Sequence, residues 1–182
     1  MYLYDGLICK LKSRFAMRVN ITIQRIAFIL ALGLLVGAPK LRACSILYYK
    51  DPVTGKIYVA NNEDYWYDVK AYIRIIPGSG QEHARLWYGW DRFAQGGVNE
   101  HGLFFDAAVT PRQEIPPGYS NPDGRNVGDE ILATCRNVEE AVQYLEHEKI
   151  AVSEGHMMLG DRGGNAVVLE WVNGETRVQK ME

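Results

Sequence analysis

The hydrophobic pattern of the chain changes its period twice, and this order strongly limits the folds that the chain can adopt. Residues 44–109 form short, strand-like apolar runs separated by glycine and proline turns. Residues 127–145 instead repeat apolar side chains every three to four positions, as amphipathic helices do. Strand-like runs return from 156 to 178. Strands, then helices, then strands predict a layered α+β domain in which the helices cover a sheet.

The strand-like runs before residue 109 predict a meander. Residues 44–50 and 57–62 flank a turn that contains Pro52 and Gly55, so they should pair as an antiparallel hairpin. Such a hairpin would bring Asp64 back to the end of the sheet where Cys44 begins. The following elements are predicted as strands at 71–77 and 83–90, a turn at 95–102 and an apolar run at 103–105.

The middle of the chain contains a proline-rich loop and a helical segment. Residues 109–126 hold four of the seven prolines and show no periodicity, which favours a long loop, either a lid over a site or a surface excursion. The helical pattern predicts two short helices or one helix broken near Asn137, which is a credible N-cap. A second hairpin is predicted at 156–171, and Asn173 with Gly174 signals a further tight turn.

Residues 1–43 differ from the remainder in charge and hydropathy. They carry a net charge of +6, whereas the remaining residues carry −8. Residues 26–38 contain no charge but are too few to cross a bilayer core, which needs about 20 residues. The pattern predicts a signal peptide at 1–43, starting at Met1 or Met17, and a mature domain at 44–182 that is exported to the periplasm or secreted. An uncleaved anchor is the alternative.

Cleavage after Ala43 would place a thiol and a free α-amino group on the same carbon of Cys44. A thiol has a pKa of about 8.5 and an α-amino group one of about 7.7–8.0, so a neutral amine can accept the thiol proton near neutral pH. Cys44 would then supply both nucleophile and base. The alternative is a cysteine that acts as a small apolar residue of a strand. Cys135 falls in the helical pattern and is expected in the core rather than in a disulfide with Cys44.

Several classes of function are excluded or disfavoured. The negative charge of the mature domain argues against a nucleic-acid partner. No zinc-protease, serine-hydrolase, P-loop or dinucleotide motif is present, so no cofactor is expected. The four histidines show no metal-ligand spacing, and no metal site is predicted: His83, His101, His147 and His156. Membrane contact is expected only through the leader or a lipid on Cys44, and association into a homo-oligomer stays open.

Five segments after residue 43 form a set of motifs in a fixed order: an initial Cys-Ser at 44–45, ANNEDYW (60–66), GGVNEHGL (96–103), DEILATCRNVEEA (129–141) and HMMLGDRGGNAVVLEW (156–171). In this set the chain resembles the cholylglycine hydrolase and penicillin V acylase family of N-terminal nucleophile hydrolases. The resemblance extends from Cys44 to about Val178. The order and spacing of these segments are more specific than any one of them.

The resemblance implies an αββα sandwich whose N-terminal cysteine attacks a linear amide and forms an acyl-enzyme that water releases. Cys44 would be nucleophile and base, and Asp64 would hold the α-amino group. Asn62 matches a family asparagine that supports the turn. Tyr65 and Trp66 are candidates for an acyl pocket, although core packing is the alternative for such aromatics. The substrates implied are acyl amides such as acylated amino acids, bile-salt conjugates, phenoxyacyl β-lactams or acyl-homoserine lactones.

The sequence departs from the family pattern in three ways. Asn61 stands where the family commonly has arginine, which removes a cation that would lower the pKa of the thiol. An asparagine or tyrosine near the oxyanion is replaced by small or apolar residues, so the backbone N–H groups of Ala108 and Val109 are the expected donors. Family members also continue beyond the point that matches Val178, which suggests a truncated fold and an inactive fragment as an alternative.

Two other functions stay open. Leu41-Arg42-Ala43-Cys44 is similar to a bacterial lipobox, so the chain could be a lipoprotein anchored through Cys44 with a non-catalytic binding role. Lipid on the sulfur and the amine of Cys44 would abolish the catalytic pair. The other is a non-catalytic remnant of the same fold that does not complete its site.

Overall fold

The first two strands form the predicted hairpin. The structure is a computed structural model that describes residues 44–65 and 67–181, so the predicted leader at 1–43 and the pocket candidate Trp66 lie outside the described residues. Strands β1 (Ser45–Lys50) and β2 (Ile57–Asn62) pair antiparallel, with Ser45 opposite Asn62. The Asp51 carboxylate closes the turn by accepting hydrogen bonds from the backbone of Val53 and the hydroxyl of Thr54. This register places Cys44 beside the residues that follow β2.

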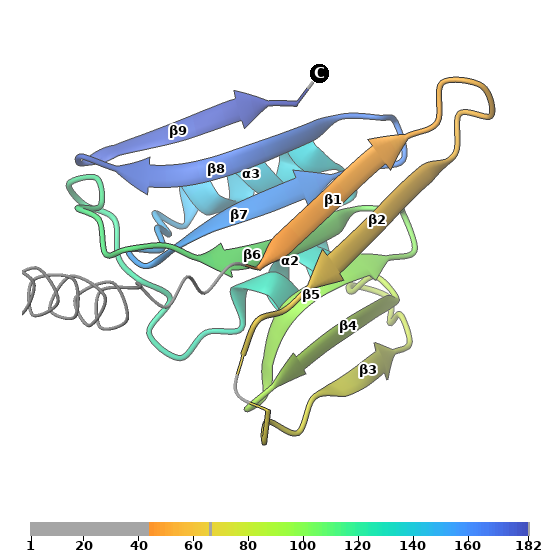
Figure 1. The fold of residues 1–182 in the computed structure, drawn as a ribbon, viewed down its shortest axis with the longest axis horizontal. Coiled ribbons are helices and arrows are strands. Elements are labelled where there is room, and N and C mark those ends of the chain that lie inside the picture. Colours follow the sequence, from red (N-terminus) through yellow and green to blue (C-terminus); the bar gives the residue numbers. More distant parts are fainter. Residues whose placement is uncertain (1–43, 66, 182) are drawn as a thin grey trace, which may run out of the picture. The chain divides into compact units, whose positions relative to one another are not determined.

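The remaining described strands form one antiparallel sheet in sequence order (Figure 1). They are β3 (Tyr72–Ile76), β4 (Arg85–Trp90), β5 (Phe93–Asn99), β6 (Phe104–Val109), β7 (Gly155–Gly160), β8 (Ala166–Val172) and β9 (Glu175–Lys180). The meander and the second hairpin are therefore confirmed. Asn173 and Gly174 both have positive φ angles, +54° and +75°, in the tight turn between β8 and β9.

The turn predicted at 95–102 begins later, because strand β5 continues through Gly96 and Gly97 to Asn99 and the turn itself is at residues 100–102. Both glycines are required by close packing. A Cβ atom on Gly97 would lie 2.5 Å from the carbonyl oxygen of Leu86 on β4, and one on Gly96 would overlap the hydroxyl of Tyr88. Glycine in a strand interior often marks such a close approach.

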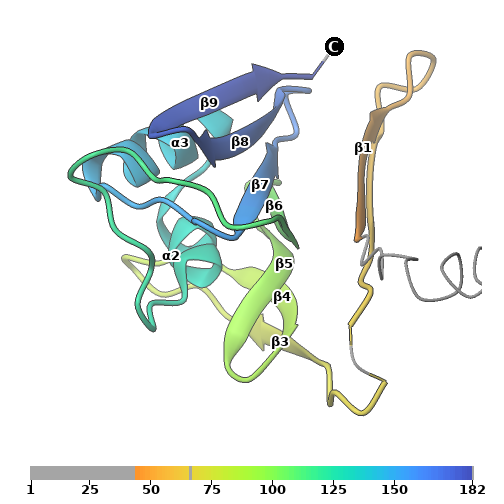
Figure 2. The same ribbon diagram turned by 60° about the vertical axis from the view of Figure 1, so that its left-hand side comes forward.

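Two helices cover one face of the seven-stranded sheet (Figure 2). They are α2 (Val127–Thr134) and α3 (Val138–His147), so the helical segment forms two helices as one alternative predicted. The Asn137 side chain caps α3 by accepting a 2.9 Å hydrogen bond from the backbone N–H of Glu140. Neither helix has the length and apolar character needed to cross a membrane.

The core lies between these helices and the sheet. Cys135 is buried there as expected, and both described cysteines are free. The largest fully buried apolar side chains are Trp87, Leu103, Phe105, Ile131, Leu132, Leu145, Ile150, Leu159 and Leu169. Gly128 allows α2 to approach β6, because a Cβ atom there would overlap the ring of Phe105.

A buried ion pair also fixes α2 to β4. The guanidinium of Arg85 donates to both carboxylate oxygens of Asp129, at 2.5 and 3.1 Å, and the indole N–H of Trp87 donates to the same carboxylate at 2.7 Å. The Arg85 side chain is only 6% exposed. Since an unpaired charge in this position would be strongly unfavourable, the pair commits the helix to one position on the sheet.

The hairpin packs against the sheet face opposite the helices (Figure 2). The ring of Tyr48 lies where a side chain at Gly160 would stand, and its hydroxyl donates a 2.7 Å hydrogen bond to the carbonyl oxygen of Asp161. Asn61 makes a second connection by donating to the carboxylate of Asp106 on β6 at 2.7 Å. Successive residues of a strand point to opposite faces, so Phe105 faces the helices and Asp106 faces the hairpin.

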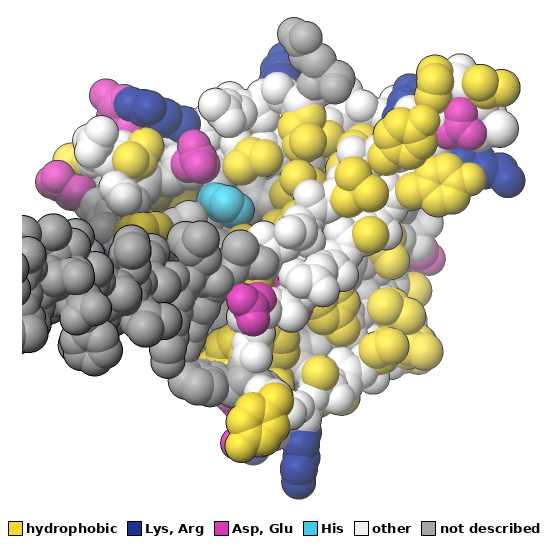
Figure 3. All heavy atoms as spheres, in the orientation of Figure 1, with side chains coloured by type: hydrophobic (Ala, Val, Ile, Leu, Met, Phe, Trp, Pro, Cys, Tyr) yellow, Lys and Arg dark blue, Asp and Glu magenta, His cyan; other side chains and the backbone are white. Residues whose placement is uncertain are grey.

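The face that carries the hairpin has many exposed hydrophobic side chains (Figure 3). Exposed residues of the hairpin and of the edge strand β3 include Leu47, Tyr49, Tyr58, Val59, Ile73 and Ile75. Two-thirds or more of the surface of Ile73 and Ile75 is accessible, at 68% and 73%.

The proline-rich segment after β6 is an irregular connection that is tied to the domain by backbone hydrogen bonds. Thr110 and Gln113 donate to the carbonyl oxygens of Glu154 and Ser153. Further along, Ser120 exchanges hydrogen bonds with the segment 149–151. The segment therefore follows the strand-like stretch that leads into β7.

Candidate functional site

The thiol of Cys44 contacts two acidic residues, Glu63 and Asp64, at the open end of the hairpin. Its Sγ donates a hydrogen bond to Oε2 of Glu63 at 3.1 Å, and the backbone N–H of Asp64 points to the sulfur. Burial raises the pKa of the Cys44 thiol, the hydrogen bond from Asp64 opposes the rise, and the carboxylates of Glu63 and Asp64 add to it. The hairpin thus brings together the two residues that the sequence singled out, and it adds Glu63.

Only one of the two carboxylate oxygens of Glu63 accepts a hydrogen bond from the described residues. Its Oε2 accepts the thiol hydrogen bond, whereas its Oε1 is buried and accepts no hydrogen bond from any residue that the structure describes. A buried acceptor without a donor is unfavourable. Glu63 therefore retains an acceptor oxygen for a further donor group.

A second set of interacting residues, centred on the buried Asp106 of β6, lies next to Cys44 and Glu63 on the sheet. The carboxylate of Asp106 is 0% exposed and accepts hydrogen bonds from the hydroxyl of Tyr88 at 2.5 Å and from the amide of Asn61 at 2.7 Å. Burial raises the pKa of Asp106 to about 7, the charge of Glu63 adds to the rise, and its hydrogen bonds oppose it. Gly96 leaves the space in which the Tyr88 hydroxyl and the Asp106 carboxylate meet.

The residues around Cys44 and those around Asp106 influence one another electrostatically. Burial and the carboxylate of Asp106 raise the pKa of Tyr88, so its hydroxyl stays protonated and donates. The charges of Glu63 and Cys44 act on Tyr88 in the same direction. Asn61, which stands where a cation was expected in relatives, is used as a neutral donor to Asp106. The region is consequently rich in negative charge, and this disfavours a free thiolate.

The other predicted residues lie at the margin of this group. Asn62 is exposed and pairs with Ser45 in the hairpin. Ala108 and Val109 are at the end of β6, opposite His156 and Gly155 of β7. Their proposed role as oxyanion donors stays a prediction.

Of the two aromatic candidates for an acyl pocket, only Tyr65 is described. Its ring stacks on that of Trp90 with centroids 4.7 Å apart, and 47% of its surface is exposed. An aromatic surface therefore extends from the end of the hairpin to β4. Trp66 lies outside the described residues.

Sequence reasoning missed three members of the group: Glu63, Tyr88 and Asp106. Glu63 could have been found from the hairpin register, which continues past the pair of Ser45 and Asn62 to bring residue 63 opposite residue 44. Tyr88 and Asp106 carry no such signal, because their approach depends on how the hairpin packs on the sheet. The fold also brings His83, Glu100 and His101 together, although the spacing of the histidines predicted no metal site.

The fold is similar to that of two solved amide hydrolases. Penicillin V acylase from Agrobacterium tumefaciens matches with a TM-score of 0.59 and 19% identity over 76% of this chain and 49% of its own. A mutant of the conjugated bile acid hydrolase from Clostridium perfringens matches with a TM-score of 0.60 and 20% identity over 77% of this chain and 51% of its own. The chain thus spans about half the length of each. No protein-family model and no curated protein sequence matches the chain.

These similarities confirm the expected fold class. The described residues share the α+β fold of these two proteins over about half the length of each, with a helical layer, a sheet and a hairpin on the far face of that sheet. The expected resemblance to penicillin V acylase and bile acid hydrolase is confirmed at the level of fold.

Proposed function

We propose that the protein hydrolyses linear C–N bonds of acyl amides with Cys44 as its N-terminal nucleophile, after cleavage of a leader that ends at Ala43. The observation that carries the proposal is the contact of the Cys44 thiol with Glu63 and Asp64, at the end of the hairpin, in a fold shared with two amide hydrolases. Export to the periplasm or beyond is part of the same proposal, because leader cleavage frees the α-amino group.

The raised pKa of the thiol makes a local base necessary. Burial and two carboxylates keep the fraction of thiolate small near neutral pH. A base that takes the proton during attack removes this limit. The freed α-amino group of Cys44 is attached to the same carbon as the thiol side chain, so it is the base with the shortest path to the proton.

The chemical steps then follow from that pair. The amine takes the thiol proton as sulfur attacks the amide carbon, the C–N bond breaks, and the resulting ammonium gives its proton to the leaving amine. Water hydrolyses the thioester, which releases the carboxylic acid and restores the thiol. The positive charge on the ammonium is stabilised by the neighbouring carboxylates of Glu63 and Asp64.

Glu63 is assigned a positioning role in this mechanism. Its Oε2 orients the thiol, and its Oε1 is the buried acceptor that can receive an N–H of the ammonium. A carboxylate oxygen stabilises the charged form of the amine, so Oε1 of Glu63 favours transfer of the thiol proton to the α-amino group. Tyr65, which stacks on Trp90, offers an aromatic surface for an apolar acyl group.

The proposal is tested by amide hydrolysis with the full chain expressed in an exporting bacterial host. Phenoxyacetyl and glycine-conjugated bile-acid amides are incubated with the purified protein, and the released amine is quantified. We expect turnover in the unsubstituted protein and in Cys135→Ala, a control that removes the other described thiol, and none in Cys44→Ala. Turnover in Cys44→Ala, or none in a protein whose first residue is Cys44, would contradict the proposal.

The role of Glu63 has its own test in the same assay. Glu63→Gln keeps the size of the side chain and removes the charge that stabilises the ammonium, so kcat should fall, whereas KM should change little. An unchanged kcat would leave Glu63 without a role in the mechanism.

A further inference from the structure

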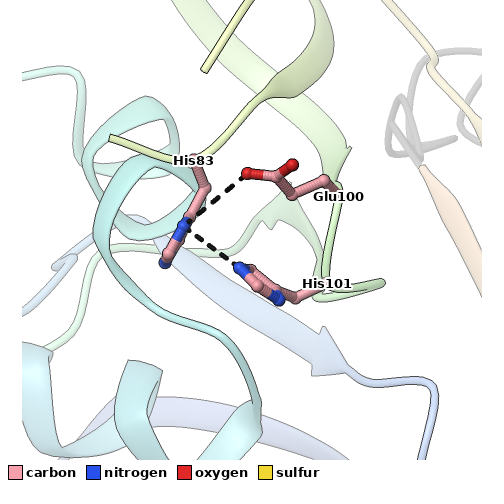
Figure 4. Close-up of side chains that lie close together, drawn as sticks. All are labelled: His83, Glu100 and His101. Carbon is pink, nitrogen blue, oxygen red and sulfur yellow. Dashed lines mark hydrogen bonds and ion pairs between the residues drawn. The ribbon is translucent and has the colours of Figure 1, made fainter. Parts of the chain in front are cut away.

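Three potential metal ligands lie close together where β4 begins and β5 ends, apart from the cysteine site. His83, Glu100 and His101 each offer one ligand atom, and these atoms all lie within 4.8 Å of one another (Figure 4). Nδ1 of His83 lies 3.1 Å from Nε2 of His101 and 3.9 Å from Oε1 of Glu100. The side chain of His83 is 17% exposed and that of Glu100 is 50% exposed, so the group is accessible from solvent.

The fold holds these residues in place before any ligand binds. The turn that carries Glu100 and His101 is closed by the buried side chain of Asn99, whose Oδ1 accepts hydrogen bonds from the backbone N–H groups of His101 and Leu103 at 3.1 Å each. The Asn99 amide also donates to the carbonyl oxygens of Leu132 and Cys135, at 2.9 and 2.7 Å. The turn is therefore fixed to the end of α2.

His83 is fixed to the same part of the domain. Its backbone N–H donates to the carbonyl oxygen of Ala133, at the end of α2, at 2.9 Å. Next to it, the N–H of Ala84 donates to Oε1 of Glu100 at 3.0 Å, and the carbonyl oxygen of Ala84 accepts from the N–H of Glu100 at 2.8 Å. Both ligand-bearing segments are thus ordered by backbone contacts.

The separation of the two imidazoles fits a hydrogen bond between the rings and also fits a tetrahedral ion bound by both. Two imidazole nitrogens bound to zinc at 2.0–2.1 Å and at the tetrahedral angle lie about 3.3 Å apart. The 3.1 Å between the facing nitrogens of His83 and His101 is close to this value. The exposed Glu100 side chain needs a small movement to reach the same ion.

The donor set also selects the class of ion. Two imidazoles and one carboxylate are typical ligands of zinc and neighbouring divalent transition metals, whereas calcium and magnesium prefer oxygen ligands alone. Three protein ligands leave one tetrahedral position for water.

We propose that His83, Glu100 and His101 form a binding site for a zinc-class divalent transition-metal ion, with water as the fourth ligand. Bound metal joins the segment before β4 to the turn between β5 and β6, both of which are attached to the end of α2. It therefore stabilises the folded state. The site uses no residue of the proposed amide hydrolase, so the two proposals stand or fall separately.

The test is zinc titration of the full chain in a Cys9→Ala, Cys44→Ala background, which removes every thiol except that of the buried Cys135 as a competing ligand. Isothermal titration with ZnCl2 should give one equivalent, and zinc should raise the melting temperature. His83→Gln and His101→Gln should each weaken binding by about 10-fold or more, since even loss of a residue that only orients a ligand weakens metal affinity by about 10- to 100-fold.

His147→Gln is the matched control, because His147 lies 3.2 Å from the carboxylate of Glu148 but is not part of the three-ligand group. It should bind zinc like the parent, and MgCl2 should give no binding. Absence of one-equivalent zinc binding, or unchanged affinity in His83→Gln and His101→Gln, would overturn the proposal.

A second measurement does not depend on the folding of any variant. In the parent protein, zinc should shift the imidazole ¹⁵N resonances of His83 and His101 and leave those of His147 in place. Shifts confined to other histidines would also overturn the proposal.

Discussion

Asp106 provides the sharpest test of how the hairpin packs on the sheet. Its carboxyl group is fully buried between β6 and the hairpin, where it accepts hydrogen bonds from Asn61 and Tyr88. Replacing it in Asp106→Asn keeps the shape of the side chain and removes the titrating group. The new amide can accept only one of the two hydrogen bonds well, so the variant should lose some stability at every pH.

The pH dependence of the free energy of unfolding separates the effect of carboxyl titration from that constant loss. Burial raises the pKa of Asp106 from 3.8 to about 7, so the folded protein binds a proton there that the unfolded chain releases. The contribution of Asp106 to the free energy of unfolding is largest below pH 3.8, falls as the pH rises, and is lost above about pH 7. Since each pKa unit is worth 1.36 kcal/mol, the total change is roughly 4 kcal/mol.

The assay is urea unfolding followed by tryptophan fluorescence at a series of pH values, for the unsubstituted protein and Asp106→Asn. The free energy of unfolding of the variant minus that of the unsubstituted protein should rise by roughly 4 kcal/mol between pH 4 and pH 8. Asp68→Asn makes the same chemical change at an exposed position and should show no such rise. A difference for Asp106→Asn that stays constant across this range would refute the buried-carboxyl account.

Three further substitutions test the helical layer by urea unfolding at neutral pH. Asp129→Ala should lower the free energy of unfolding by about 3 kcal/mol, because the buried guanidinium of Arg85 loses its bidentate partner and keeps only the half-exposed carboxylate of Glu82 as a charged partner; a loss below about 1 kcal/mol would contradict that burial. Gly128→Ala should lower it by about 1–2 kcal/mol, because the new Cβ overlaps the ring of Phe105 and this outweighs the gain in helix propensity; a more stable variant would show that α2 is not so close to β6. Asn137→Ala should cost about 1 kcal/mol through loss of the N-cap, and an unchanged value would argue against that cap.

Local signals in the sequence were sufficient for most elements of the fold. The hairpin was predictable because the turn at Pro52 and Gly55 interrupts two alternating runs, and the register then follows from the length of the turn. The boundary between the helices was predictable because Asn137 is a strong N-cap. In both cases the deciding contacts are made within a few residues.

Strand β5 shows where local reasoning fails. Gly96 and Gly97 have the composition of a turn, but they are glycines because Tyr88 and Trp87 of the neighbouring strand approach them closely. Such an approach is set by packing between strands, so it leaves no distinct local pattern. The composition of the segment cannot distinguish a turn from a crowded strand.

The residues of the candidate site likewise fall into those that local sequence signals predict and those that only packing brings together. Cys44 and Asp64 were predictable because one hairpin joins them, and Glu63 is a consequence of its register. Asp106 and Tyr88 enter the site only because the hairpin packs on the sheet, and the order of strands in a sequence does not specify that contact. The grouping of His83 with His101 likewise depends on the pairing of β4 with β5.

The proposed chemistry depends on one covalent event, the cleavage that exposes the amino group of Cys44. N-terminal sequencing combined with intact mass measurement of the protein recovered from an exporting host tests it directly. The account predicts a chain that begins at Cys44 with an unmodified amine and a free thiol. A chain that begins at any other residue, or a mass that shows diacylglycerol on Cys44, would contradict it.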